Sequence, residues 1–205
     1  MSNLCEKLLD ACIGANCENP LFQGVDSIGY IANYSDIAEI TYDETNPSIV
    51  NGITMKTIDE TGTDPISACF YTIQQLGNNP FNGSQIEMTE GTYMNRFTNT
   101  VNFAVLDNSP EVSEHIIDNL ANGRFVVILK NDYTGTDGSA KYQIFGAKKG
   151  LKAASITREL YGDAESAWVV SMTEENAPKS GLFVWKTNEA TTDDLVDNLL
   201  CECDE

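Results

Sequence analysis

An uninterrupted apolar run near the middle of the chain restricts the possible folds more than any other part of the sequence. Residues 124–130 read Arg-Phe-Val-Val-Ile-Leu-Lys, so five apolar residues follow one another between two cations. A strand with one face in water alternates polar and apolar side chains, whereas a continuous apolar run is typical of a strand buried on both faces. The run therefore predicts a central strand in a β-rich core.

Further segments have the composition of short strands. They are rich in Ile, Tyr, Thr, Val and Phe and are bounded by Gly, Asn, Asp and Pro, which form turns. We expect these strands at residues 27–33, 37–42, 49–58, 66–74, 85–93, 96–106, 141–145, 151–157, 167–173 and 182–186. In one of them, Thr98, Thr100 and Asn102 alternate with Phe97, Val101, Phe103 and Val105. That alternation predicts one wet face and one buried face.

The clearest helix is expected at residues 111–122. Ser109 can cap its first turn, Pro110 suits the first helical position, and Gly123 is a typical stop. Its core-facing stripe is expected at Val112, Ile116 and Leu120.

Together these segments predict a mainly β (α+β) fold, a β-sandwich or barrel flanked by one helix. The expected parts are a helix and arm at residues 1–24, the principal domain at residues 25–190 with helix 111–122, and a helix and tail at residues 191–205. The two terminal helices are expected at residues 4–13 and at residues 193–201, the second one capped by Thr192.

Acidic residues far outnumber basic ones. The chain holds 31 Asp and Glu against 12 Lys and Arg, which gives a formal net charge of -19 at pH 7. Such a field repels nucleic-acid phosphates, so it excludes a reader of DNA or RNA sequence as a function class. It is compatible with a wall along which DNA passes without specific binding.

The few basic residues are unevenly distributed. Residues 1–95 hold only Lys7 and Lys56, whereas five of the twelve cations fall within residues 141–158. Those five are Lys141, Lys148, Lys149, Lys152 and Arg158. They form either a solvated basic hairpin or a patch that docks on an acidic face of a neighbouring subunit, where opposite charges fix the register. The polar loop at residues 77–84, with apolar Phe81 at its tip, is a second candidate for subunit contact.

Several function classes find no support in the sequence. No signal pattern is present and no apolar run approaches about 18 residues, so we expect a cytoplasmic product without membrane insertion. The single histidine, His115, lies inside the expected helix, and without it no Ser-His-Asp or Cys-His arrangement can be built. Residues 132–138 superficially resemble a calcium loop but lack its alternating ligands and closing Glu. We expect no enzyme activity and no cofactor.

Six cysteines are the remaining group of residues that could form a chemical site. Cys5, Cys12 and Cys17 lie near one end, Cys201 and Cys203 near the other, and Cys69 inside an expected strand. Their spacing is not that of paired zinc knuckles, and a reducing cytosol disfavours disulfides. We therefore expect free thiols or small apolar side chains, with a metal site or an interchain disulfide as the alternatives.

The order of elements from Gly91 onward resembles a known layout. A Thr-rich hairpin, helix 111–122 and the apolar strand are followed by Lys141-Tyr-Gln-Ile-Phe-Gly146, Gly150-Leu-Lys, Arg158-Glu-Leu-Tyr-Gly-Asp-Ala and Ser166-Ala-Trp-Val-Val-Ser-Met-Thr. In layout and local style, over about residues 25–190, the chain resembles tailed-bacteriophage tail tube (major tail) proteins. The general style also resembles structural proteins of phages that infect Bacteroides-type bacteria.

The resemblance implies a structural role. It implies a β-sandwich or barrel flanked by one helix, which assembles into hexameric rings stacked as a tube. The expected partners are other copies of the chain and other phage tail proteins, with DNA passing through the tube unbound. The protein would then belong to the virion tail after synthesis in the bacterial cytoplasm.

A β-sandwich module that recognises a glycan or a protein is the alternative function. Glycan recognition would need exposed aromatic platforms. Trp168 and Trp185 lie in apolar strand contexts, where burial in the core is expected.

Overall fold

The computed structural model describes residues 24–59, 66–75, 80–92, 94–135, 137–158, 160 and 167–201. Within these residues the chain is mainly β, as the sequence predicts, with thirteen strands and three short α-helical segments. The expected helix at residues 4–13 and nearly all of the expected arm lie outside the described residues.

The larger sheet has seven strands in the order β2-β3-β13-β10-β9-β1-β6. Their bounds are β1 Val25–Asn33, β2 Ile37–Tyr42, β3 Ile49–Met55, β6 Tyr71–Gln74, β9 Phe125–Asn131, β10 Tyr142–Phe145 and β13 Leu182–Val184. Neighbouring strands are antiparallel, except that β13 and β3 pair in parallel.

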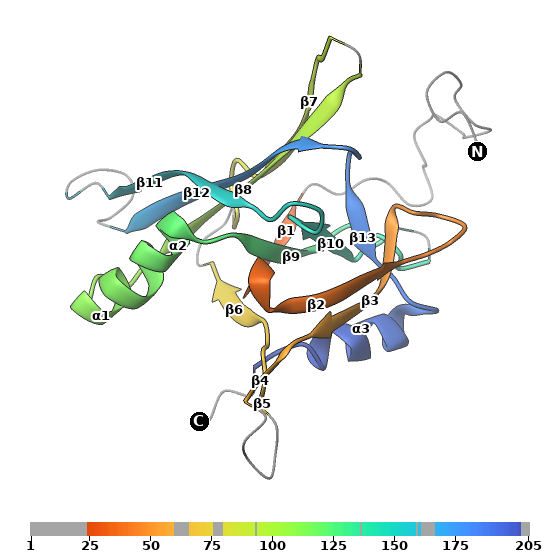
Figure 1. The fold of residues 1–205 in the computed structure, drawn as a ribbon, viewed down its shortest axis with the longest axis horizontal. Coiled ribbons are helices and arrows are strands. Elements are labelled where there is room, and N and C mark those ends of the chain that lie inside the picture. The colour runs from red at the N-terminus through yellow and green to blue at the C-terminus, as the bar shows by residue number, and fades with distance from the viewer. Residues whose placement is uncertain are drawn as a thin grey trace.

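The smaller sheet has four strands in the order β11-β12-β8-β7. Their bounds are β7 Gln85–Thr89, β8 Arg96–Val105, β11 Lys152–Arg158 and β12 Trp168–Ala177, and a separate two-stranded sheet pairs β4 Thr57–Asp59 with β5 Ile66–Ser67. The smaller sheet lies across the larger one, and its β7–β8 hairpin extends beyond the body of the molecule (Figure 1).

Strand β9 separates two cores. Val126 and Ile128 belong to a cluster formed by the seven-stranded sheet and the C-terminal helix, whereas Phe125, Val127 and Leu129 belong to a cluster between the two sheets. All five side chains are between 0% and 6% exposed. The expectation of a strand buried on both faces is confirmed.

The helix after β8 begins and ends close to the expected bounds but contains a wider turn. It consists of α1 Pro110–Val112, a π-helical turn Ser113–Ile117 and α2 Asp118–Asn122. The Ser109 hydroxyl accepts a hydrogen bond from the Val112 N–H, as its expected capping role requires. Because a π turn holds more residues than an α turn, the buried position moves from Ile116 to Ile117, which is 5% exposed against 42% for Ile116. The expected core position of Ile116 is therefore wrong.

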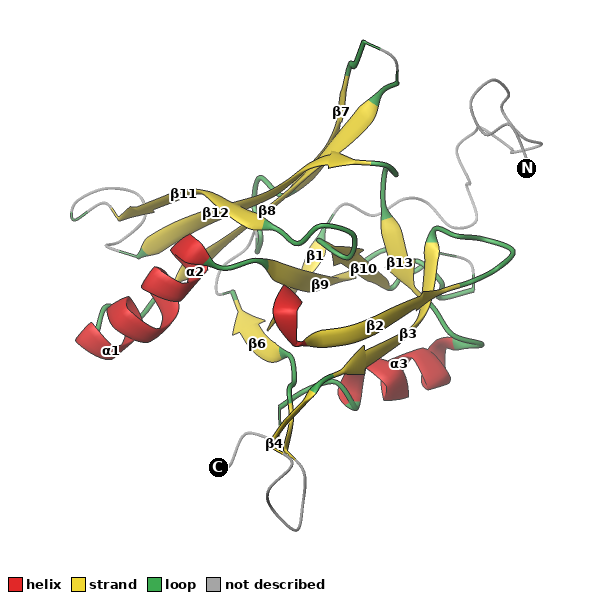
Figure 2. Ribbon diagram, viewed as in Figure 1, coloured by secondary structure: helices red, strands yellow, loops and turns green. Residues whose placement is uncertain are grey.

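The C-terminal helix α3 spans Glu189–Asp197 (Figure 2), so it begins and ends earlier than the expected residues 193–201. The Asn188 side chain accepts from the Thr191 N–H at 2.9 Å, and the Thr191 hydroxyl accepts from the Asn188 N–H at 3.1 Å. This reciprocal cap fixes the start at Glu189. The expected cap, Thr192, is wrong, because that residue lies within the helix and its hydroxyl donates to the Asn188 carbonyl at 2.8 Å.

Two cysteines contradict the expectation of free thiols. Cys69 and Cys201 form an intrachain disulfide across a sequence separation of 132 residues. Backbone hydrogen bonds bring them together: the Phe70 N–H donates to the Leu199 carbonyl and the Cys201 N–H donates to the Phe70 carbonyl. The sequence could not predict this pairing because it depends on where the end of α3 meets the segment before β6.

Replacing both Cys69 and Cys201 by Ser should lower the free energy of unfolding of the oxidised protein by about 2–4 kcal/mol, because the disulfide restricts the unfolded chain. Denaturant unfolding with and without reductant measures this difference. Reduced wild-type protein should match the double variant. Equal stability of the oxidised wild type and the variant would contradict the expectation.

Candidate assembly surfaces

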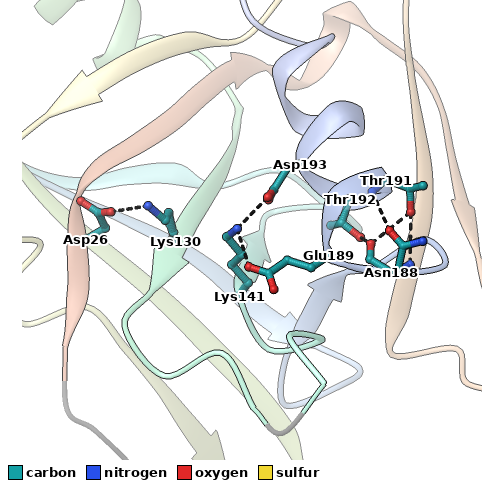
Figure 3. Close-up of polar contacts among 8 residues, drawn as sticks. All are labelled: Asp26, Lys130, Lys141, Asn188, Glu189, Thr191, Thr192 and Asp193. Atoms are coloured by element: carbon teal, nitrogen blue, oxygen red, sulfur yellow. Dashed lines mark hydrogen bonds and ion pairs between the residues drawn. The ribbon is translucent and has the colours of Figure 1, made fainter.

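Lys141, the first basic residue singled out in the sequence, is bound within its own chain. Its Nζ lies 2.8 Å from a carboxylate oxygen of Glu189 and 2.8 Å from one of Asp193, both on α3 (Figure 3). Burial acts to lower the pKa of Lys141, but the two carboxylates outweigh burial and raise it. Lys141 therefore fastens α3 to the start of β10 rather than serving an open patch.

Lys152 and Arg158 stand at the two ends of β11. Six residue steps at about 3.3 Å place them about 20 Å apart along the strand. The Arg158 guanidinium lies 5.6 Å from the centre of the Trp168 ring. The structure therefore does not bring all five expected basic residues into one patch.

Lys148 and Lys149 lie in the turn between β10 and β11, where cations from other segments join them. Lys149 and Arg96 line one open cavity of about 450 Å³. The Lys148 Nζ lies 3.5 Å from the centre of the Tyr42 ring, and the Lys179 Nζ donates to the Ser48 hydroxyl at 3.4 Å. Burial, and after it the charge of Lys148, lower the pKa of Lys179. We call Arg96, Lys148, Lys149 and Lys179 the cationic cluster. The sequence missed two of its members because Arg96 comes from the start of β8 and Lys179 from the loop after β12, far along the chain from the other two.

A buried carboxylate holds the turn of the cationic cluster in place. Glu174 is 4% exposed, and its carboxylate accepts hydrogen bonds from the Asn99 side chain and from the N–H groups of Gly146 and Lys149. Burying a polar group without a hydrogen bond costs roughly 2–7 kcal/mol, and burying an unpaired charge costs more, so Glu174 needs these donors. Glu174 thereby links β12 and β8 to the turn.

The end of β12 bulges beside the same turn. Its register shifts between Glu174 and Ala177, and Asn176 has a positive φ of 58°. The Lys149 Nζ donates to the carbonyls of Glu175 at 3.4 Å and Asn176 at 3.1 Å. The bulge therefore positions Lys149 at the hairpin end of the sheet.

Phe81, expected at the tip of an assembly loop, is a core residue. It is 3% exposed and belongs to the cluster between the two sheets. Its positive φ of 54° turns the side chain inward, where a Cβ at Gly29 would lie only 2.8 Å from the ring. Phe81 therefore cannot contribute to the expected subunit interface. It is the apolar side chain of an otherwise polar loop, and it is buried in the core of its own chain.

The four-stranded sheet has two free edges and a polar face. Among the described residues, no strand pairs with the outer edge of β7 or of β11. The face turned away from the body carries Thr98, Thr100, Asn102, Ser171 and Thr173, all partly exposed, which confirms the expected wet face. Hydroxyls and amides therefore dominate its centre.

An apolar groove lies at the opposite end of β8. It has a volume of about 1120 Å³ and is bordered by β6, the end of β8 and the helix at residues 110–122. Three of its lining side chains are unusually exposed for apolar residues: Tyr71 at 58%, Leu106 at 54% and Ile116 at 42%. Strand β6 is also an edge of the seven-stranded sheet, so its outer edge borders the groove without a partner among the described strands. Such a surface is typical of an interaction site.

The sequence predicts no catalytic or metal-binding set, and His115 and the loop at residues 132–138 come nearest to one. His115 lies on the exposed side of its helix and lines the groove. No group of three or more His, Cys, Asp and Glu suited to a metal ion occurs among the described residues. In the loop expected to differ from a calcium site, the Asp137 carboxylate accepts from the Ser139 hydroxyl at 2.6 Å, which lowers the pKa of Asp137. None of the helices in the described ranges is long and apolar enough to cross a membrane.

Replacing Lys141 by Met should lower the free energy of unfolding at pH 7 by about 1–2 kcal/mol, because Glu189 and Asp193 lose their shared cation. Since the folded pKa of Lys141 is raised, its contribution is complete below its ordinary pKa of 10.5 and is lost as the pH rises through the folded pKa. Urea unfolding at pH 7, 9 and 11 should show the two proteins converging only at the highest pH. Lys186→Met, an exposed lysine next to the same helix, is the control, and an equal loss in both variants would contradict the role of Lys141.

Comparison with known proteins assigns no family. The chain matches no protein-family model, and no curated protein or solved structure matches it significantly. What these surfaces do is therefore inferred from their own chemistry.

Proposed function

We propose that this protein is a structural subunit that assembles with copies of itself into rings, stacked as a tube, in the manner of the tail tube proteins that its layout resembles. The observation that carries the proposal is the four-stranded sheet, whose edge strands β7 and β11 have no outer partner among the described residues. A free edge exposes a row of backbone N–H and C=O groups that invites pairing with another chain. Both edges can be satisfied at once if β7 of one copy pairs with β11 of the next.

The strand directions suit such a ring. All three pairs within the sheet are antiparallel, so β7 and β11 run in opposite directions. A β11 strand placed beside β7 of another copy would therefore continue the antiparallel pattern. Repetition around a closed ring would remove every edge of this sheet, which is how β-barrels avoid exposed edges.

The polar face of the sheet suits the inner wall. The body of the molecule covers the opposite face through Val101, Val170 and Met172, so the polar face is the one free to line a lumen. Threonine, serine and asparagine side chains dominate β8 and β12 on this face, where Lys152 (beside Thr173) and Arg96 are separate cations. Such a face offers no concentrated positive charge to hold DNA, so a polyanion would pass unbound. The two central strands contribute mainly uncharged side chains to this wall, and the acidity expected of a conduit would come from the remaining surface of a chain of net charge -19.

On this proposal the remaining expectations follow from the resemblance. Six copies would form each ring, other tail proteins would meet the ends of the tube, and the protein would be found in the virion tail after synthesis in the bacterial cytoplasm. The subunit would need no cofactor, catalytic residue or membrane.

A protein-binding module is the second candidate, and the apolar groove favours it. An extended peptide can add to an edge strand such as β6 while its side chains fill a neighbouring groove. A protein ligand suits the groove better than a glycan, because Trp168 and Trp185 are both partly buried and form no exposed platform. This candidate requires a monomer that binds a foreign partner.

Negative-stain electron microscopy and sedimentation of the concentrated protein should show closed rings or tubes in equilibrium with monomer. The variant Gln85→Lys/Glu87→Lys on β7 should raise the concentration needed for assembly about tenfold or more, equivalent to at least about 1.4 kcal/mol per contact. Lysines on an edge strand disfavour edge-to-edge pairing.

The matched control is Glu39→Lys/Thr41→Lys on β2, an edge of the other sheet. Both variants change one Glu and one neutral residue to Lys, so their charge is the same. The control should assemble like the wild type. A wild-type protein that stays monomeric at every concentration would overturn the proposal and leave the binding module as the better explanation.

A further inference from the structure

We propose that copies of this chain also associate head to tail, with the hairpin end of one copy docked on the helix end of the next. This inference rests on the proposed function. The contact between the two ends is the one that would stack one ring on another. The two ends are joined by β8, a strand of ten residues that begins at the hairpin and ends before the helix (Figure 1). At about 3.3 Å per residue the strand separates them by about 30 Å.

The hairpin end combines apolar side chains with positive charge. Met88 on β7 is 57% exposed and Met94 in the connecting turn is 51% exposed. Arg96 is paired with Thr89, the residue after Met88, and shares a cavity with Lys149. The exposed methionines of the hairpin and the cationic cluster therefore lie at the same end of the four-stranded sheet, with Met88 and Arg96 on opposite faces of it.

The helix end combines an apolar groove with negative charge. Leu106 and Ile116 are exposed within the groove. Glu111, Glu114 and Asp118 are exposed on the adjoining helix, and their spacing of three and four residues puts them on one side of it. The ion pairs of the described residues involve none of these three carboxylates.

The two surfaces are complementary in both respects. Copies that each carry a net charge of -19 repel one another over most orientations. The cationic cluster against the helix carboxylates is an orientation in which opposite charges meet, and such complementarity selects the register of a contact. The methionines, which adapt their shape to irregular surfaces, would then fill the groove. Because the two surfaces differ, the contact can repeat from copy to copy, and because they lie at opposite ends of β8 the repeat extends along the strand as a stack.

A charge-swap experiment tests the contact. Lys148→Glu/Lys149→Glu reverses the cationic cluster, and Glu114→Lys/Asp118→Lys reverses the helix. Each double variant alone should form stacks only at a concentration about tenfold or more above that of the wild type, because like charges then face each other. An equimolar mixture of the two double variants should recover stacking, since the reversed surfaces complement each other in alternating copies.

A chain carrying all four substitutions supplies the second readout. It has the net charge of the wild type and should stack again, which also shows that the substitutions leave the fold intact. Stack length by electron microscopy and mass by sedimentation measure the result. Wild-type stacking in either double variant, or failure of both the mixture and the fourfold variant to recover it, overturns the inference.

The apolar part is tested separately with Met88→Gln. This change should shorten the stacks at a given concentration, whereas Ile58→Gln, which alters a side chain that is 66% exposed outside both surfaces, should not. Equal effects of the two changes would contradict docking of the hairpin. Rings that form but never stack would overturn only this inference, whereas a protein that never forms rings would overturn the proposed function.

Discussion

The burial of β9 on both faces is the constraint on which the rest of the structure depends. Its five apolar side chains alternate between two clusters, so each face requires its own covering layer. The C-terminal helix covers one face and the four-stranded sheet covers the other. Each fully buried residue of this size contributes about 1.5–3 kcal/mol. A polar residue in the strand would weaken the cluster that its side chain faces, at the centre of a sheet in which β9 also pairs with β1 and β10.

The four-stranded sheet covers β9 with one face only, which explains why no described element covers its other face or its outer edges. Only one face is needed for burial, and therefore Thr100 and Ser171 can remain in contact with water on the other. The seven-stranded sheet occupies the buried face, so it cannot pair with the edges β7 and β11. The hairpin continues past the core, where Met88 stays exposed. The proposed assembly surfaces thus lie where the sheet extends beyond the core that it covers.

Most of the fold could be predicted from the sequence, because its strands carry strong local patterns. The alternation from Phe97 to Val105 and the apolar run of β9 indicated both the strands and their buried faces. The failures have longer-range causes: the π turn moved Ile116 out of the core, and the cap at Asn188 depends on a reciprocal bond with Thr191. The basic patch was predicted only in part. Lys148 and Lys149 are adjacent in sequence, whereas Arg96 and Lys179 join them through sheet pairing and a bulge.

The strong acidity of this chain and the unpaired edges of its described strands have opposite effects on association. Exposed edges promote indiscriminate pairing, and a net charge of -19 opposes it by keeping copies apart. Screening limits this repulsion to about 8 Å at physiological ionic strength, so it acts mainly on close approach in wrong orientations. An orientation that joins the cationic cluster to carboxylates escapes the penalty. The same charge that keeps copies apart would therefore make the proposed assembly selective.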